Sequence, residues 1–233
     1  RQIGMSAVQS SLYLGFVLSL LAYLFGAWLK KKFGWAILNP LLISVILVIV
    51  ILKIFHIDYE TYNNSGKYIS YLLTPSTVCL AIPLYKQLEL LMKNAVAVIA
   101  SIIAGVIASA GSIFVLCTVF GLSHQEYVTF LPKSITTAIG MGVSEQAGGV
   151  VTLTVVCIII TGIFGNIVAD AVFAIARIKH PVARGLALGT SAHAIGTAKA
   201  LELGEVEGAM SSLAIAVAGL LTVIIVPMIS GLI

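Results

Sequence analysis

One polar, glycine-bounded stretch limits the fold of this chain more than any other feature. Residues 189–205 carry three hydroxyl groups, an imidazole, an ammonium group and two carboxylates, whereas the flanking segments 182–188 and 209–233 are mostly apolar. In hydrocarbon every backbone polar group needs an internal partner, so a segment of this kind is tolerated only inside protein or beside a water-filled cavity. We therefore expect an interrupted membrane helix that contributes to a binding site.

Composition places the whole chain among membrane proteins. Apolar residues make up 60% of its 233 residues and charged residues 9%, and the mean hydropathy is +1.11. These values are typical of polytopic membrane proteins. With roughly 20 apolar residues for each crossing, the chain has room for about seven transmembrane helices. We expect an all-α fold in a single membrane domain over residues 1–233.

The charges and cysteines argue against several function classes. The net charge is +4, but the basic residues form no stripe with aromatic residues, so we expect no nucleic-acid partner. Cys79, Cys117 and Cys157 fall in apolar segments without metal-ligand spacing. The sequence contains no phosphate-binding loop, serine-hydrolase motif or zinc-protease motif. We therefore expect neither an enzyme nor a bound metal or cofactor.

Apolar segments predict where the chain crosses the membrane. The first, 7–29, is not a signal peptide, because its positive cluster follows the apolar residues instead of preceding them. The stretch 56–67 is polar and aromatic, as expected of an interfacial loop. Segment 68–85 contains Pro75 and Pro83, so we expect no regular helix through its middle. The other predicted spans are 36–55, 94–120, 149–175, the interrupted span at 189–205, and 209–233.

The distribution of basic residues predicts an orientation. Lys30, Lys31 and Lys32 in the cytoplasm place the N-terminus and the loop 123–127 outside, while Arg177, Lys179 and Arg184 favour the inside. One net crossing then remains between residues 128 and 177, so we expect 131–147 to be re-entrant and the C-terminus to be cytoplasmic. The alternative is that 131–147 crosses fully, which reverses the later orientation.

Two interrupted spans run in opposite directions in this topology. One contains Thr74, Ser76 and Thr77 beside prolines, and the other contains Ser191 and His193. Paired interruptions in oppositely oriented halves are typical of secondary transporters with inverted repeats and a site near the midplane. We therefore predict inverted 3+3 repeats over 36–121 and 131–233, with the two interrupted helices meeting at one polar cavity.

Hydroxyl and cationic side chains in these segments are the candidate ligands of a small anion. The exposed N–H groups at the start of a half-helix attract a carboxylate, and a nearby cation would offset its charge. The candidate substrate-binding residues are Thr74, Ser76, Thr77, Lys133, Ser134, Thr136, Thr190, Ser191, His193, Thr197 and Lys199.

Each of these candidates has a structural alternative. The hydroxyls can serve only as helix caps, and Lys199 can extend its charge to the membrane surface. His193 is the candidate for proton coupling, since the unperturbed pKa of a histidine, about 6.5, lies near neutral pH; the alternative is a buried structural histidine. Asn166 and Asp170, four residues apart on one helix face, are further coupling candidates or form a buried interhelical hydrogen bond.

Four motifs resemble those of the LrgB/CidB family. They are TPSTVCLAIPLYKQ at 74–87, LPKSITT at 131–137, GTSAHAIGTA at 189–198 and GEVEGA at 204–209. The resemblance covers the chain from about Asn39 onward. Two departures are that Thr74 stands where the family usually has glycine, and that Ala138, Ile139 and Gly140 replace a Pro-Ile-Ala continuation.

The resemblance implies two functions. One is secondary transport of small monocarboxylates such as pyruvate, glycolate or glycerate across a bacterial inner or plasma membrane. The other is antiholin-like regulation of murein hydrolase activity and autolysis. In both cases the resemblance implies a multi-pass protein that acts with a small LrgA/CidA-type membrane partner. A homo-oligomer is a further expectation.

Overall fold

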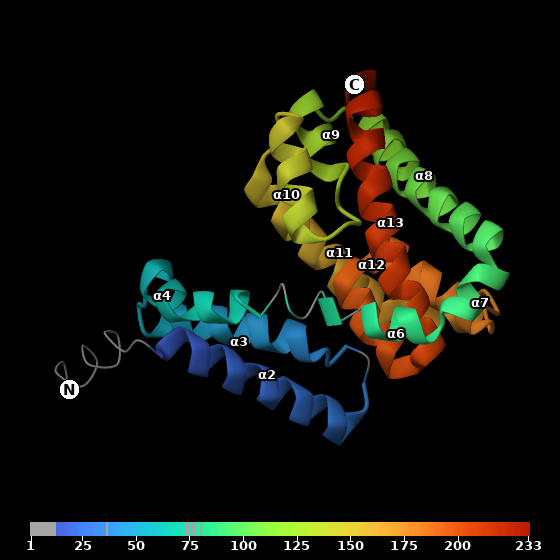
Figure 1. The fold of residues 1–233 in the computed structure, drawn as a ribbon. Coiled ribbons are helices and arrows are strands. Elements are labelled where there is room, and N and C mark those ends of the chain that lie inside the picture. The colour runs from blue at the N-terminus through green and yellow to red at the C-terminus, as the bar shows by residue number, and fades with distance from the viewer. Residues whose placement is uncertain (1–12, 36, 73–74, 76–77, 80) are drawn as a thin grey trace. The chain divides into compact units, whose positions relative to one another are not determined.

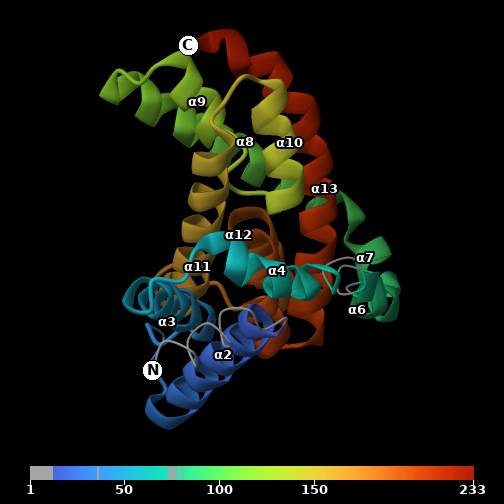
Figure 2. The ribbon, with the colours of Figure 1, turned by 90° about the vertical axis from the view of Figure 1, so that its left-hand side faces the viewer.

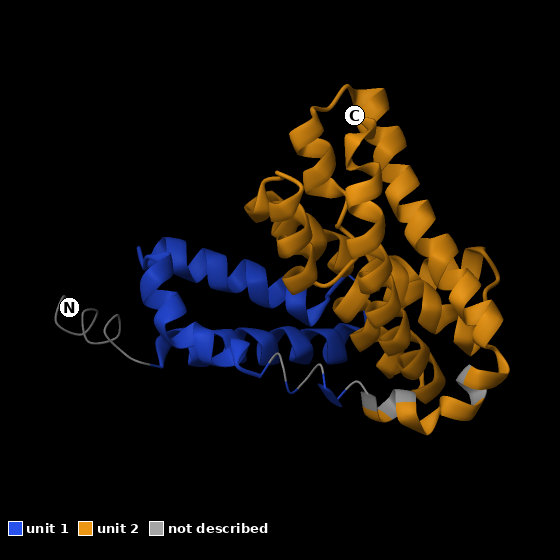
Figure 3. Cartoon of the chain, turned by 45° about the horizontal axis from the view of Figure 1, so that its top comes forward, with its two compact units in different colours: residues 1–79 blue, residues 80–233 orange. Residues whose placement is uncertain are grey.

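A computed structural model describes the backbone of residues 13–35, 37–72, 75, 78–79 and 81–233. The chain forms two compact units, residues 1–79 and residues 80–233 (Figure 3). The regular structure in the described ranges is helical, as the composition predicts. Thr74, Ser76 and Thr77, three of the predicted ligands, lie outside the described residues.

Three helices make up the described part of the first unit (Figure 1). Helix α2 (Leu14–Phe33) ends in three lysines, whose charge is favourable at a helix C-terminus. Helix α3 (Pro40–Ile54) begins where the Asn39 side chain accepts hydrogen bonds from the backbone of Leu41 and Leu42. Helix α4 (Tyr59–Ser70) packs against α2.

The prediction of a loop at 56–67 is wrong, because most of this stretch is helix α4. The Asp58 carboxylate accepts hydrogen bonds from the hydroxyl and the backbone N–H of Thr61, which caps the helix and lowers the pKa of Asp58. Further along the helix, the hydroxyl of Ser65 accepts a hydrogen bond from the backbone N–H of Gly15, 2.6 Å away. A polar sequence is therefore helical here because α2 supplies partners for its side chains.

The second unit contains three long helices and several shorter ones (Figure 2). The long helices are α8 (Ala95–Phe120), α11 (Val151–Ile175) and α13 (Glu205–Ile229), which continues as a 3-10 turn at Ser230–Leu232. The shorter helices are α6 (Ala81–Lys86), α7 (Leu88–Lys93), α9 (His124–Phe130), α10 (Thr137–Gln146) and α12 (Pro181–Leu203), which is bent.

Four helices in the described ranges are long and apolar enough to cross a membrane, namely α2, α8, α11 and Glu205–Leu232. Helix α3 is apolar but shorter. These elements fit a multi-pass membrane protein, while the predicted total of about seven crossings stays unconfirmed. Short helices α6 and α7 lie before α8, and α6 includes Pro83. The middle of segment 68–85 falls largely outside the described residues, so the expectation that no regular helix runs through it stays a prediction.

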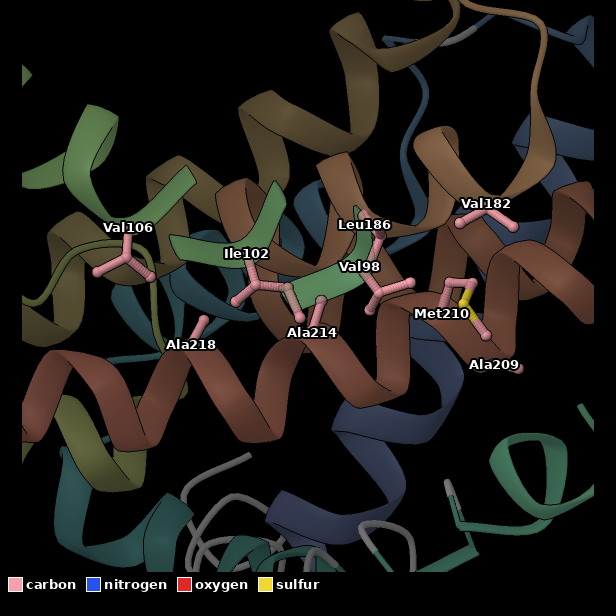
Figure 4. Packing of buried hydrophobic residues seen from close by; sticks show 9 residues of the cluster. All are labelled: Val98, Ile102, Val106, Val182, Leu186, Ala209, Met210, Ala214 and Ala218. Carbon is pink, nitrogen blue, oxygen red and sulfur yellow. The ribbon is translucent and has the colours of Figure 1, made fainter. Parts of the chain in front are cut away.

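Helices α8 and α13 run in the same direction and pack through a buried apolar cluster (Figure 4). Val98, Ile102 and Val106 of α8 face a row of small side chains on α13 that includes Ala214 and Ala218. Small side chains allow close approach of membrane helices. Further along, Tyr127 donates a hydrogen bond to the carbonyl of Ile229, 3.1 Å away.

This packing corrects the predicted position of the C-terminus. The stretch 123–127, predicted to be a loop, forms the start of helix α9. The backbone oxygen of Ile233 lies 2.7 Å from Nδ1 of His124, so residue 233 and the start of α9 are at the same end of the second unit (Figures 1 and 2). The predicted topology placed them on opposite sides of the membrane. The reason for the error is the course of α12, which does not cross from one end to the other.

Helix α12 folds back on itself at His193. His193 has a φ of 43° and a ψ of −134°, which interrupts the helix between two regular halves. A side chain at Gly196 would meet Cβ of Ala192 at 2.7 Å and would also meet the backbone of Leu188. Residues eight apart in a continuous helix are separated by about 12 Å, so this approach requires a hairpin. The predicted interruption is therefore present, but the predicted crossing at 189–205 is wrong.

Helices α9 and α10 are joined by a turn, and both contact α11. A capping box between Ser123 and Glu126 begins α9, and hydrogen bonds from the backbone and the hydroxyl of Ser123 lower the pKa of Glu126. After the turn at residues 131–136, Ser144 of α10 approaches the start of α11, where it accepts a hydrogen bond from Thr154 at 2.7 Å. The single Thr154 hydroxyl hydrogen is shared with the carbonyl of Thr129, whose oxygen lies 2.9 Å away. The chain thus returns to the level of Thr129 near the end of α9, while the prediction that 131–147 is re-entrant in the membrane stays unconfirmed.

Candidate functional site

One pocket is lined by three segments: the turn at 131–136, the first half of α12 and helix α8. This pocket, which we call the Lys133 pocket, has a volume of about 490 Å³. It is lined by six hydroxyl side chains, one ammonium group and five small or aliphatic residues. They are Ser101, Gly105, Ala108, Ser109, Ser112, Lys133, Ser134, Ala183, Leu186, Ala187, Thr190 and Ser191.

The ammonium group of Lys133 is held by two serine hydroxyls. Its Nζ lies 2.9 Å from Oγ of Ser134 and 3.4 Å from Oγ of Ser109. Ser109 in turn donates to Ser134 at 3.0 Å. These bonds join the turn between α9 and α10 to the middle of α8, which fixes the position of the cation at the wall of the pocket.

Donors remain unused at this wall. Lysine has three N–H donors, and Ser134 acts as acceptor in both of its hydrogen bonds, so one Lys133 N–H and the Ser134 O–H have no acceptor within the described part of the chain. Over the same residues, no carboxylate forms an ion pair with Lys133. A half-buried cation without a counter-charge inside a membrane bundle is a candidate functional residue, and its charge suits an anion.

The hydroxyls of α12 in the pocket are bonded to their own helix. Thr190 donates to the carbonyl of Leu186 at 2.8 Å, and Ser191 donates to that of Ala187 at 2.6 Å. The O–H groups of Thr190 and Ser191 are therefore occupied in this structure, and only their oxygens can accept further hydrogen bonds. The donors for an anion therefore come from Lys133 and Ser134, and α12 contributes shape and acceptor atoms.

His193 lies at the tip of α12 but is not among the residues that line the pocket. Its side chain is 3% exposed, and its Nε2 lies 2.9 Å from the carbonyl oxygen of Ile158. Because a carbonyl can only accept, Nε2 carries the proton and Nδ1 is left for a second proton. Gly162 provides space for the ring, since a Cβ there would lie 2.8 Å from Cε1 of His193.

The backbone of His193 has a conformation that is unusual for a residue other than glycine. A positive φ costs on the order of 1–3 kcal/mol and persists only where the surroundings enforce it. Side chains donate hydrogen bonds to two backbone carbonyls at the bend. Asn166 donates to the carbonyl of Ile195 at 3.1 Å, and Thr197 donates to that of His193 at 3.1 Å. The interhelical hydrogen bond considered for Asn166 is thus present.

The other predicted residues lie outside the Lys133 pocket. Lys199 forms an ion pair with Asp170 at 2.7 Å, so its charge has a counter-ion within the chain. Thr197 also shares a hydrogen bond with Ser211 of α13 at 2.7 Å. Thr136 occupies the N-cap position of α10. A role for any of these residues in ligand binding stays a prediction.

Sequence reasoning missed the contribution of α8. Three serines of this helix line the pocket, namely Ser101, Ser109 and Ser112. They are isolated polar residues in a long apolar segment, so the sequence pattern did not indicate a binding role for them. A signal was available in the spacing of small residues. Ser101, Gly105, Ala108 and Ser112 recur every three or four residues, which places them on one face of the helix.

Comparison with known proteins gives a consistent assignment. The sequence model described as the LrgB-like family matches residues 19–232. Antiholin-like protein LrgB of Bacillus cereus (strain B4264) is 40% identical over 217 residues, which cover 93% of this chain and 94% of that protein. The protein of the same name from Bacillus anthracis (strain A0248) has the same identity and coverage. No solved structure matches this chain.

Proposed function

Because this multi-pass membrane chain belongs to the LrgB-like family, we propose that it has the antiholin-like role for which its relatives are named, and that its molecular activity is to carry a small carboxylate anion. The first part is supported by 40% identity over 93% of the chain to antiholin-like protein LrgB. The second part is supported by the unpaired cation in the Lys133 pocket.

The pocket chemistry favours a small monocarboxylate. One ammonium group balances one negative charge, and hydrogen bonds between charged groups are about twice as strong as neutral ones. The Ser134 O–H supplies a second donor for the carboxylate of an acid such as pyruvate or glycolate. The O–H groups of the other pocket hydroxyls are occupied, so their oxygens can accept a hydrogen bond from the 2-hydroxyl group of glycolate. A volume of about 490 Å³ lies within the range of roughly 300–1,000 Å³ that is usual for small-molecule sites.

We further propose that the chain acts in a bacterial cell membrane together with a small LrgA/CidA-type membrane protein. His193 is the proposed coupling residue, because its Nδ1 is free to take up a proton while Nε2 anchors the ring to α11. The two halves of α12 meet at this residue, so a change in its charge acts directly on the bend of the hairpin.

An uptake assay tests the carrier activity. The full chain is reconstituted in liposomes with and without the small partner, and entry of radiolabelled pyruvate and glycolate is measured under a proton gradient. Uptake above that of empty liposomes is expected for at least one of these acids. If none of them enters in either preparation, the carrier activity is refuted, and a change in the autolysis rate of cells that express the chain tests the antiholin-like role separately.

A further inference from the structure

A second, smaller cavity adjoins the Lys133 pocket. It has a volume of about 10 Å³, close to the space of one water molecule. Ser109, Ser134 and Thr190 line both cavities, so these three hydroxyl residues form the boundary between them. Gly105 supports the boundary, since a Cβ on that residue would lie 3.0 Å from the Thr190 hydroxyl.

The polar groups around the small cavity match the needs of one water molecule. Thr222 of α13 lines only the small cavity, and its hydroxyl donates to the carbonyl of Ala218 at 2.7 Å. Thr190 is occupied in the same way, so both threonine oxygens are left as acceptors. The O–H of Ser134 is left as a donor. When no anion occupies the Lys133 pocket, a water molecule that accepts from Ser134 and donates to Thr190 and Thr222 would satisfy all three groups.

Beyond Thr222 the lining is aliphatic. Leu131, Ile135 and Val226 are almost fully buried and close the small cavity. They belong to a larger apolar cluster with Cys117 and Tyr127, which fills the end of the bundle where residue 233 lies. Among the described residues, those that line the small cavity beyond Thr222 are aliphatic, so a hydrated anion cannot pass in this direction without losing its water.

We propose that the path of the anion continues from the Lys133 pocket, past Ser109, Ser134 and Thr190, into the small cavity beside Thr222, and that Leu131, Ile135 and Val226 are the gate that closes it. The inference rests on the proposed carrier activity for its biological meaning. Thr222 is then the next polar group of the path after Ser109, Ser134 and Thr190. The conformation described here is closed at the end of the bundle that contains residue 233.

Thiol labelling tests the gate without relying on transport. Thr222→Cys and Ser191→Cys are introduced separately into full-length chain that lacks Cys79, Cys117 and Cys157, and both are treated in liposomes with a charged, water-soluble methanethiosulfonate. Since thiol reactivity follows exposure, Thr222→Cys should react at least about tenfold more slowly than Ser191→Cys, which is exposed in the pocket.

Truncation of the gate should open the cavity. Adding Leu131→Ala or, as a milder change, Val226→Ala is expected to raise the labelling rate of Thr222→Cys several-fold. Ile163→Ala, a change at a buried residue of α11 that lines neither cavity, should leave that rate unchanged. The proposal is overturned if Thr222→Cys reacts as fast as Ser191→Cys in the intact chain, or if both truncations leave it protected. Failure of the uptake assay with the expected labelling pattern would refute the carrier activity and not the gate.

Discussion

The imidazole Nε2 of His193 lies 2.9 Å from the carbonyl oxygen of Ile158, which anchors the tip of the α12 hairpin to the middle of α11. This bond joins the residue with the unusual backbone to a helix that runs through the whole unit. Replacement by asparagine separates its structural and chemical roles, because asparagine tolerates a positive φ and keeps an N–H donor but does not titrate.

We expect His193→Asn to fold with a thermal unfolding midpoint near that of the parent chain and to lose uptake that is driven by a proton gradient. Exchange of labelled for unlabelled acid without a gradient should persist. His180→Ala, at an exposed residue before α12, is the matched control and should change neither activity. Normal proton-driven uptake by His193→Asn would exclude His193 as the coupling residue.

Gly162 is expected to be intolerant of any side chain. A Cβ at this position would lie 2.7 Å from Cδ1 of Ile195 and 2.8 Å from Cε1 of His193, so Gly162→Ala should destabilise the chain by about 1–3 kcal/mol through overpacking. Gly111→Ala in α8 is the control, because no atom lies within 4 Å of its added Cβ. Unfolding of both variants in detergent measures the difference, and equal stabilities would contradict the packing of His193 described here.

The ion pair between Lys199 and Asp170 should contribute little to stability. The Asp170 side chain is 57% exposed, so solvent screens the pair from that side although Lys199 is only 14% exposed, and solvent-screened pairs typically contribute about 0.2–1 kcal/mol. A double-mutant cycle with Lys199→Gln and Asp170→Asn, measured by denaturant unfolding, should give a coupling energy in this range that falls as salt is added. A coupling energy several times larger would mean that the pair is buried in the membrane-embedded protein.

The corrected topology places the start of α9 and the C-terminus on one side of the membrane. Since Arg177, Lys179 and Arg184 favour the cytoplasm, we expect both to be extracytoplasmic. Single cysteines at Ser123 and Ser230, in a chain without native cysteines, should react with an impermeant reagent from outside. A cysteine at Lys179 should react only after the membrane is opened. Labelling of Ser123 and Ser230 positions from opposite sides would restore the original prediction.

The sequence predicts where α12 is interrupted but not how. Glycines and hydroxyls at 189–205 indicate that a lipid-facing helix is unsuitable, whereas the direction after the break depends on the φ and ψ of His193 alone. Helix α4 was missed for a related reason, since its partners Gly15 and Ser19 are distant in sequence. Ser109 was missed because its importance comes from Lys133 across 24 residues, a contact that no local pattern shows.

The central claim is that Lys133 provides the charge for a small carboxylate, and direct binding tests it. Calorimetric titration of pyruvate into purified chain should give an affinity that Lys133→Gln weakens by roughly tenfold or more, since a hydrogen bond to a charged group contributes about 1.5–3 kcal/mol. Lys133→Arg should retain most of the affinity. Lys179→Gln, at an exposed residue outside the pocket, should bind as the parent chain does. Unchanged affinity in a folded Lys133→Gln variant would contradict the anion site.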